Sequence, residues 1–387
     1  MAKRKPRIAV IGAGLGGPAT AALLQRAGYE VKVYEQSPRF SRIGAGINLS
    51  PNCTRILKRI GVGDPLARAG ARTTHWVSRE WDSGDILLDY PMGGALEEHY
   101  GAPYLCVHRG DFHALLLESV EAGSVHFGKR LEGFEQKGET VKIAFADGSR
   151  AQADLVIGAD GVRSRCRELL VGLKPPKFTG YVAYRSIFPV SLLAGRMEVL
   201  DYEKFWGPGC FLFLSYFITA KREDHFIVTS SPQAEWPHEG PSAPADLEEM
   251  RAAFAGFHPR VQRQLEVIPS ATKYAVYDAE PLPVWSRGRV VLLGDACHAM
   301  TPYMGQGAAM AIEDGAMLMR CLDAAKDDVD HALRLYEANR KDRTAAMQQT
   351  SRENNWLKSG AEPDWVWGYD VFAEPLVQPS DRARVSG

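Results

Sequence analysis

The sequence has little of what would mark a membrane protein, a nucleic-acid binder or a metalloprotein. No uninterrupted run of apolar residues reaches the length of about 18 that a membrane-spanning helix needs. The formal net charge is −1, which gives no attraction to nucleic acid or to an anionic membrane. The six cysteines are scattered, without a CxxC pair or a Cys/His cluster at metal-ligand spacing. We therefore expect a soluble, cytoplasmic protein with reduced thiols and no bound metal.

Several catalytic signatures are also missing. The chain has no GxSxG motif and no Cys/His nucleophile signature, which is consistent with chemistry that needs no protein nucleophile. It has no internal repeats and no low-complexity tract, which excludes repeat architectures. A second GxGxxG with a basic partner is absent as well, so a nicotinamide cofactor is expected to dock only transiently.

What is present is a nucleotide-binding unit at residues 6–36. An apolar strand at 7–11 is followed by a glycine-rich turn, an Ala- and Leu-rich helix, a second strand at 30–34 and then an acidic residue, Glu35. Gly12 allows a tight turn, Gly14 lets the backbone approach a pyrophosphate, and Gly17 lets the helix pack closely on the strand. Phosphates then lie at the helix N-terminus, and Glu35 follows at the offset where a carboxylate binds a ribose diol. The unit predicts dinucleotide binding.

The rest of the chain predicts a second module inserted into the nucleotide-binding domain. Residues 73–91 alternate in polarity, and residues 178–232 are rich in aromatic and β-branched residues, as in antiparallel strands. We expect an α/β fold with a discontinuous, Rossmann-like parallel-sheet domain, an inserted, mainly antiparallel substrate domain and a helical C-terminal tail. The expected blocks are 1–73, 102–175 and 276–345 for nucleotide binding, 74–101 and 176–275 for the substrate domain, and 346–387 for the tail.

Two later motifs separate flavin binding from nicotinamide binding. One is Gly158-Ala159-Asp160-Gly161 after a buried strand, and the other is Gly294-Asp295 after the strand at 289–293, followed by Gly305 to Ala308. With the first unit, they resemble the group A flavoprotein monooxygenases, the single-component aromatic hydroxylases related to 4-hydroxybenzoate and salicylate hydroxylases. The three fingerprints occur in order, and the resemblance covers nearly the whole chain.

The resemblance implies bound FAD, reduced by NADH or NADPH as a transient partner. It places Asp295 on the ribityl hydroxyls, Arg109 on the ribityl or flavin side, and Arg42 near the pyrophosphate. The glycines at 305–308 would face the flavin pyrimidine ring from a helix N-terminus, where developing negative charge is stabilised. The FAD-binding residues that it implies are Gly12, Gly14, Gly16, Gly17, Glu35, Gln36, Arg42, Asn48, Arg109, Leu131, Asp160, Asp295, Gly305, Gly307 and Ala308.

The implied reaction is hydroxylation of an aromatic or N-heteroaromatic acid through a flavin C4a-hydroperoxide. The expected partners are O2 and a small aromatic acid, 6-hydroxynicotinate-like or hydroxybenzoate-like, in aromatic degradation, and the chain is expected to be a monomer or a homodimer. The main alternative is a flavoprotein of the same fold that oxidises a non-aromatic substrate, of the epoxidase or reductase type. A plain NAD-dependent dehydrogenase and a non-catalytic nucleotide-binding protein are further alternatives. The two later motifs argue against the dehydrogenase, and the substrate sheet argues against the non-catalytic protein.

Three residues are candidates for substrate contact. The chain shares a tail motif at residues 364–370 with one branch of the family, in which histidines occupy the positions of Asn48 and Tyr303. Tyr216 matches a pocket tyrosine of that branch. We therefore expect Tyr216, Asn48 and Tyr303 to form a neutral, aromatic catalytic pocket without an imidazole. The alternative for each tyrosine is an aromatic residue that only packs on a sheet or loop.

Overall fold

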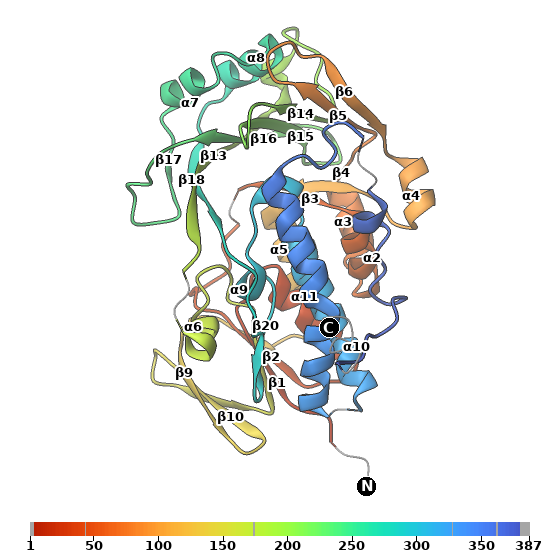
Figure 1. Ribbon diagram of the computed structural model, residues 1–387, viewed down its shortest axis with the longest axis vertical. Helices are drawn as coiled ribbons and strands as arrows, with labels where there is room; N and C mark the ends of the chain where they lie inside the picture. The colour runs from red at the N-terminus through yellow and green to blue at the C-terminus, as the bar shows by residue number, and fades with distance from the viewer. Residues whose placement is uncertain (1–3, 43, 173–174, 327, 361–362, 380–387) are drawn as a thin grey trace, which may run out of the picture.

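The computed structural model describes residues 4–42, 44–172, 175–326, 328–360 and 363–379 (Figure 1). The first three residues of the expected nucleotide-binding block and the last eight of the expected tail therefore lie outside the described residues. The described residues form four sheets, and the two largest lie toward opposite ends of the long axis of the molecule. The predicted α/β architecture is confirmed.

The first sheet carries the nucleotide-binding unit. It has six strands in the order β19-β20-β12-β1-β2-β8, and all neighbours are parallel except the edge pair of β19 and β20. The central strands are buried along their whole length, as expected for a parallel sheet covered on both faces. The strands are β1 (Ile8–Ile11), β2 (Val31–Tyr34), β8 (Val125–His126), β12 (Leu155–Gly158), β19 (Ser286–Arg287) and β20 (Val290–Leu292).

Helices from both ends of the chain pack together against this sheet. The helix α1 (Gly16–Arg26) follows the glycine-rich turn and packs against α10 (Gly307–Ala324), which in turn packs against α11 (Val329–Glu353). Figure 1 shows α11 running along the molecule from the first sheet toward the second. None of the helices formed by the described residues combines the length and apolar character needed to cross a membrane.

The second sheet has eight strands in the order β17-β18-β13-β16-β15-β14-β5-β6, and only the pair β14 and β5 is parallel. It is the expected, mainly antiparallel substrate sheet, and β5 and β6 join it from the early part of the chain. The strands are β5 (His75–Glu80), β6 (Ile86–Pro91), β13 (Lys177–Pro189), β14 (Tyr202–Trp206), β15 (Leu212–Phe217), β16 (Asp224–Pro232), β17 (Ser242–Pro244) and β18 (Thr272–Asp278).

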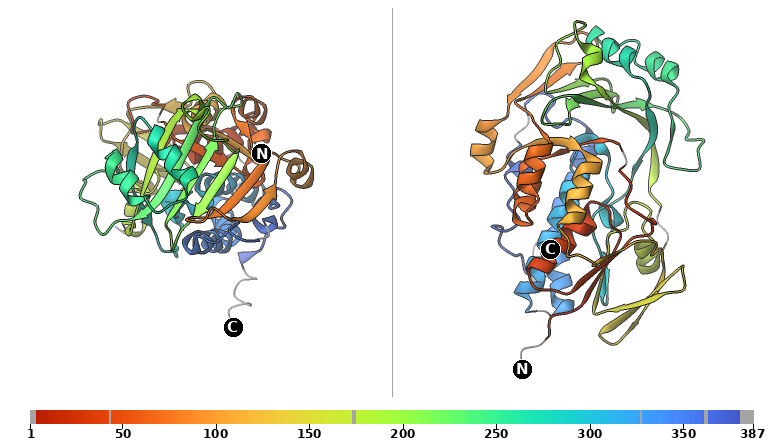
Figure 2. Two further views of the ribbon diagram at one scale, coloured as in Figure 1. Left: turned by 90° about the horizontal axis from the view of Figure 1, so that it is seen from above. Right: turned by 180° about the vertical axis from the view of Figure 1, so that it is seen from behind.

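The two faces of the large sheet have different partners. Its outer face packs on α7 (Leu247–Ala253) and α8 (Pro259–Val267), seen from above in Figure 2, through an apolar cluster that includes Phe205 and Phe213. Because successive residues of a strand point to opposite faces, the neighbours Lys204 and Leu212 lie on the inner face. The inner face is turned toward the parallel sheet, and the space between them forms the site.

Smaller elements complete this space. A three-stranded sheet of β4 (Ala71–Arg72), β7 (Leu105–His108) and β3 (Gly46–Leu49) presents residues 45–48 to it. The short helix α9 (Asp295–His298) carries the second acidic motif at the carboxyl end of β20. A separate three-stranded sheet, β9 (Leu131–Lys137), β10 (Thr140–Phe145) and β11 (Arg150–Ala153), lies beside the parallel sheet.

Candidate active site

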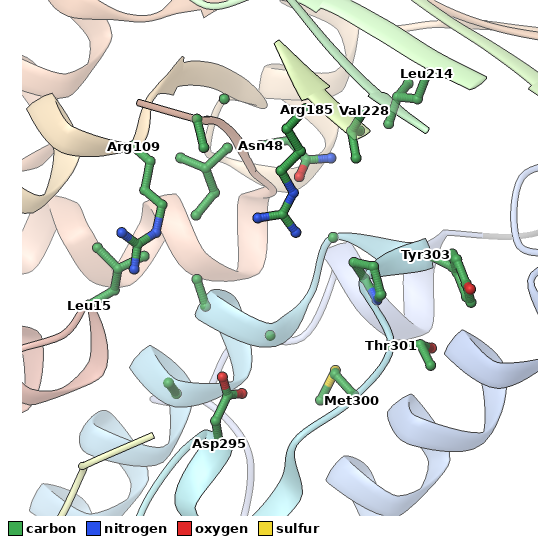
Figure 3. A pocket seen from close by; sticks show the side chains of 18 of the residues that line it. Leu15, Asn48, Arg109, Arg185, Leu214, Val228, Asp295, Met300, Thr301 and Tyr303 are labelled. Carbon is green, nitrogen blue, oxygen red and sulfur yellow. The ribbon is translucent and has the colours of Figure 1, made fainter. Parts of the chain in front are cut away.

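A cavity of about 400 Å³ lies between the parallel sheet and the inner face of the large sheet (Figure 3). The glycine-rich turn and Asp295 line one part of it, and strands β13 to β16 line the other. Nucleotide-binding elements and a substrate sheet thus share one continuous space at a domain junction, where ligand sites are common. The predicted residues that line it are Gly14, Gly16, Asn48, Arg109, Tyr216, Asp295, Tyr303, Gly305, Gly307 and Ala308.

The glycine-rich turn has the geometry that a pyrophosphate needs. A Cβ atom on Gly12, whose φ is +105°, would lie 2.5 Å from the Ala159 carbonyl oxygen, and one on Gly17 would lie 2.0 Å from the Gly12 oxygen. Packing therefore requires glycine at both positions. Gly14 differs, because a Cβ there would meet no protein atom within 4 Å although Gly14 lines the cavity. Its backbone is open to a ligand, which fits the close approach of a dinucleotide phosphate.

Three residues expected at the adenosine and pyrophosphate end lie outside the cavity lining. The Glu35 carboxylate accepts hydrogen bonds from the backbone N–H groups of Ala13 and Ser37, both at 2.8 Å, and so braces the glycine-rich turn. Gln36 is exposed. Arg42 is also exposed and forms a bidentate pair with Asp111 at 2.6 and 3.0 Å. Their predicted contacts with FAD stay predictions.

Leu131 and Asp160 also lie outside the cavity lining. Leu131 is the first residue of β9 and is buried. Asp160 accepts hydrogen bonds from the Cys166 backbone N–H at 2.9 Å and the Ser164 hydroxyl at 2.5 Å, and so fixes the turn that starts α6 (Arg165–Val171). Their predicted contacts with FAD also stay predictions.

Asp295 is the one carboxylate among the residues that line the cavity. Its side chain is exposed to the cavity and not packed in the core, and it points inward in Figure 3. Burial raises the pKa of Asp295, against the opposing influence of the neighbouring His298, Arg109 and Arg167. Its carboxylate makes no hydrogen bond with another described residue, so its acceptors are available to a ligand rich in hydroxyl groups.

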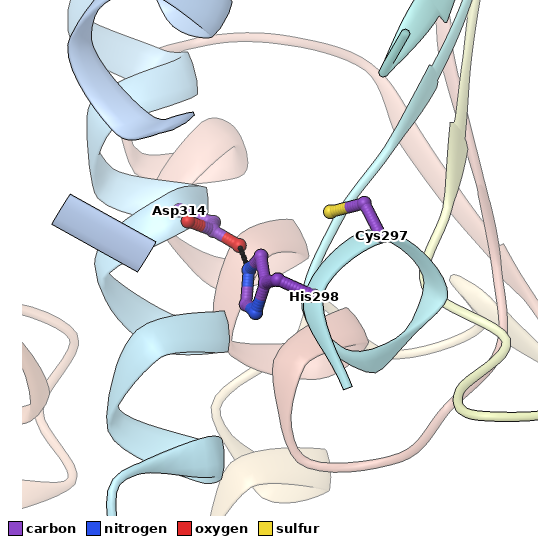
Figure 4. A group of neighbouring side chains, drawn as sticks. All are labelled: Cys297, His298 and Asp314. Carbon is purple, nitrogen blue, oxygen red and sulfur yellow. Dashed lines mark hydrogen bonds and ion pairs between the residues drawn. The ribbon is translucent and has the colours of Figure 1, made fainter. Parts of the chain in front are cut away.

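A buried network of hydrogen bonds holds the turn that precedes Asp295. Asp314 on α10 accepts from the Gly294 backbone N–H at 2.9 Å, and its Oδ2 lies 2.5 Å from Nε2 of His298 (Figure 4). Its Oδ1 accepts from Nε of Arg340 at 2.6 Å. Burial alone would raise the pKa of Asp314, but His298 and Arg340 lower it to about 2. The network therefore holds an ionised carboxylate that fixes the turn before Asp295.

Cys297, His298 and Asp314 are also grouped as metal ligands would be. Their potential ligand atoms lie within 4.8 Å of one another, and all three residues are buried (Figure 4). Both oxygens of Asp314 are already engaged by Gly294, His298 and Arg340. The group thus has a complete role as a hydrogen-bonded support, and the expected absence of a metal stays a prediction.

The same network continues into the helices. Glu313 pairs with Arg340 at 2.7 Å and with Arg343 at 2.8 Å, and it accepts from the Asn52 amide at 2.7 Å. The side chains of Arg340, Glu313 and Asp314 are fully buried. These contacts join α2 (Pro51–Arg59), α10 and α11 beneath the cavity.

The three residues expected to contact substrate all line the cavity. Tyr216 stacks on Tyr202, with ring centroids 5.2 Å apart and planes 10° apart, and its hydroxyl makes no hydrogen bond with another described residue. The Asn48 amide donates to the hydroxyls of Tyr104 and Tyr202 at 2.7 and 3.2 Å. The Tyr303 hydroxyl lies 3.2 Å from that of Ser230. Tyr216 is therefore the one of the three whose side chain makes no hydrogen bond with another described residue.

The structure also reveals two cationic residues that the sequence analysis missed, Arg185 on β13 and Lys204 on β14. With Arg109, they place three cationic residues against the single carboxylate of Asp295 in the cavity lining. Arg109 and Arg185 point into the cavity in Figure 3. The cavity that these residues share with Tyr216 is therefore not the neutral pocket that was expected. The sequence indicates the strands of this sheet, but it does not tell which face of the sheet each charged residue occupies. The charge balance suits an anionic cofactor and an anionic substrate.

Comparison with known proteins identifies the family of this chain. The family model described as FAD binding domain matches residues 5–351. A Bordetella bronchiseptica protein named 6-hydroxynicotinate 3-monooxygenase is 51% identical over 375 residues, covering 97% of this chain and 98% of that protein. A Pseudomonas fluorescens protein of the same name is 47% identical, covering 98% and 99%. A solved salicylate hydroxylase substrate complex superposes with a TM-score of 0.81 at 28% identity, covering 95% and 97%.

Proposed function

The chain belongs to the FAD-binding family of aromatic monooxygenases, and from this premise we propose that it hydroxylates a small aromatic or N-heteroaromatic acid. It is an FAD-dependent monooxygenase, with NADH or NADPH as reductant. The single observation that carries the proposed substrate class is the shared cavity, in which cationic residues outnumber carboxylates and an aromatic face is present. The non-aromatic alternative is not favoured, because the relatives are named for aromatic substrates.

FAD bound in this cavity would supply the electron transfer and the activation of O2. The chain's own residues position and isolate the reaction. We propose that Gly14 and Gly16 hold the pyrophosphate, that Asp295 binds the ribityl hydroxyls, and that Gly307 and Ala308 at the start of α10 face the flavin ring. Leu212, Leu214 and Val228 line the opposite part of the cavity with apolar surface. This surface limits water around the ring that is hydroxylated.

We propose a 6-hydroxynicotinate-like or hydroxybenzoate-like acid as substrate. The relatives named for 6-hydroxynicotinate support this choice, and the tyrosine-lined inner sheet fits a flat ring. Tyr216 would accept a hydrogen bond from the ring hydroxyl, and electron density on the ring rises as the proton is drawn toward the tyrosine oxygen. Asn48 and Tyr303 would position the ring as neutral partners.

The test is a panel of hydroxypyridine carboxylates and hydroxybenzoates. Each acid is added to FAD-loaded protein with NADH or with NADPH, and consumption of the reductant is followed together with formation of hydroxylated product. Stimulated consumption with stoichiometric product from at least one ring acid supports the proposal. Bound FAD without stimulation by any ring acid would return the non-aromatic flavoprotein to first place.

Tyr216→Phe is expected to reduce substrate-dependent turnover by about five- to 150-fold while FAD content is unchanged. The change removes one hydroxyl and keeps the ring that stacks on Tyr202. A polar partner left unsatisfied costs about 1–3 kcal/mol, which gives this range. Tyr277→Phe, on β18 of the same sheet but outside the cavity lining, is the matched control. Full activity of Tyr216→Phe on the best panel acid would remove Tyr216 from the proposed mechanism.

We also propose that the domain blocks given above are the functional units, in a cytoplasmic monomer or homodimer. The membership of β5, β6 and β13 to β16 in one sheet supports the assignment of residues 74–101 and 176–275 to a common substrate domain. The membership of β1, β8, β12 and β20 in the parallel sheet supports the assignment of residues 1–73, 102–175 and 276–345 to FAD binding.

A further inference from the structure

Lys204 is an unusual residue for the wall of a cavity. It lies in the middle of β14 and is only 1% exposed, yet it lines the space between the two sheets. Its Nζ donates to the Tyr303 carbonyl oxygen at 3.2 Å and to Oδ1 of Asn354 at 3.4 Å, and it lies 3.5 Å from the centre of the Trp206 ring. Within the described part of the chain, no carboxylate forms an ion pair with it.

The adjacent residue shows how the strand keeps this lysine unpaired. Glu203 points to the outer face of the sheet, where Arg79 binds it at 2.7 Å and Arg260 at 2.9 Å. Adjacent residues of a strand point to opposite faces, so Glu203 and Lys204 do not neutralise each other. The Glu203 carboxylate on the outer face is paired with two arginines, whereas the Lys204 ammonium on the inner face has no anionic partner among the described residues.

A buried ammonium group without a counter-ion is costly, because it has lost the hydration that stabilises its charge. Burial accordingly lowers the pKa of Lys204 well below its ordinary value, and the nearby Cys210 thiol opposes this shift only in part. Two neutral oxygens and the face of the Trp206 ring surround Nζ, and none of these partners carries a full negative charge. The ammonium charge therefore stays without a counter-ion until an anionic ligand enters the cavity.

Lys204 lies beside a residue that is expected to contact the substrate ring. The residue whose carbonyl binds its Nζ, Tyr303, also bonds Ser230 through its hydroxyl, and all three residues line the cavity. Arg109, by contrast, lies close enough to Asp295 for that carboxylate to raise its pKa, although burial lowers the pKa overall. The Arg185 guanidinium stacks 4.5 Å from the centre of the Tyr274 ring.

We propose that Lys204 binds the carboxylate of the aromatic acid and is the residue that distinguishes an acid from its neutral analogues. This inference rests on the proposed function. The Asn354 side chain, at the end of α11, positions the ammonium group together with the Tyr303 carbonyl. The carboxylate supplies the counter-ion that the described residues do not provide.

The binding of the acid would then be linked to a proton. At a pH below the pKa that Lys204 has in the empty site, the amine is already charged. The affinity for the acid then does not change with pH. Above that pKa each bound carboxylate draws one proton onto Nζ, so affinity falls by about tenfold per pH unit. A neutral carboxamide has no such dependence, because it does not favour the charged amine.

The experiment compares one acid with its carboxamide. Binding of 6-hydroxynicotinate, or of the panel acid that the wild type hydroxylates, is measured through the absorbance change of the bound flavin, alongside the corresponding carboxamide. Lys204→Met is expected to weaken binding of the acid by at least about tenfold and to leave the carboxamide unchanged. Lys204→Arg keeps the charge and is expected to recover part of the acid affinity.

Lys273→Met is the matched control, because Lys273 is a buried lysine of the same sheet that pairs with Glu249 outside the cavity lining. It is expected to change neither affinity in FAD-loaded protein. The pH dependence of acid binding is expected to disappear in Lys204→Met and to persist in Lys273→Met. Calorimetry in two buffers of different ionisation enthalpy measures the proton uptake directly.

The outcomes separate this inference from the proposed function. Unchanged acid affinity in Lys204→Met, with wild-type hydroxylation of the acid, overturns the inference and leaves the function standing, with Arg185 as the next candidate. Equal weakening of acid and carboxamide also overturns it, because Lys204 would then only support the pocket. A wild type that binds FAD but hydroxylates no ring acid overturns the proposed function and this inference together.

Discussion

Replacing Arg340 with methionine is expected to lower the free energy of unfolding by about 3–5 kcal/mol. Arg340 is fully buried and pairs with Asp314 at 2.6 Å and with Glu313 at 2.7 Å. Methionine keeps much of the volume but removes the one arginine that pairs with Asp314, which keeps only His298 and the Gly294 backbone N–H. Glu313 keeps Arg343 and the Asn52 amide. A buried carboxylate without its partner keeps the desolvation cost and loses the compensation.

The measurement is urea unfolding of the wild type and the variant at the same FAD concentration. Arg334→Met is the control, because Arg334 is an exposed arginine of the same helix, α11, and its loss is expected to cost less than about 0.5 kcal/mol.

Acid should reduce the difference in unfolding free energy between the wild type and Arg340→Met. The pKa of Asp314 is about 2 in the folded wild type, and its ordinary value is near 3.9. The stability that ionised Asp314 contributes is present above pH 4 and is lost as pH falls toward 2. A loss below 1 kcal/mol at neutral pH would show that the network stands without Arg340.

The sequence predicted the fold because its signals are local. The glycine spacing at Gly12, Gly14 and Gly17 encodes a turn whose packing the structure shows directly. Asp295 follows a short buried strand, and that position alone directs it to the carboxyl edge of the parallel sheet, where ligands bind. The aromatic and β-branched composition of residues 178–232 predicted the antiparallel strands of the substrate sheet.

The sequence could not predict contacts that depend on strand register or on distant partners. Lys204 and Arg185 could be recognised as cavity residues only after the inner face of the sheet was known, because a shift of one residue would turn them outward. Arg42 meets Asp111 across 69 positions of sequence, a pairing that no local pattern encodes. The Glu35 carboxylate accepts a hydrogen bond from the backbone N–H of Ala13 in the glycine-rich turn, and the sequence pattern did not indicate this contact either.

Asp295→Ala is expected to weaken FAD binding by about 10- to 150-fold. A carboxylate that accepts from ribityl hydroxyls forms charge-assisted hydrogen bonds worth about 1.5–3 kcal/mol, and 1.4 kcal/mol corresponds to tenfold in affinity. The structure supports a cofactor role over a folding role. The Asp295 carboxylate has no hydrogen bond to another described residue, and burial raises its pKa, so the protein holds it at a cost in the absence of a ligand.

This argument predicts opposite changes for the two states of the protein. Without FAD, Asp295→Ala is expected to be as stable as the wild type or slightly more stable, because a carboxylate whose charge is disfavoured by the surrounding protein has been removed. With FAD, it is expected to lose the stabilisation that the cofactor gives through binding. FAD titration of the apoprotein by flavin fluorescence, with urea unfolding of both states, measures each change. Asp330→Ala, an exposed aspartate in the first turn of α11, is the control and should bind FAD as the wild type does. If Asp295→Ala lowers the stability of the apoprotein and leaves FAD affinity unchanged, then Asp295 supports the fold rather than the cofactor.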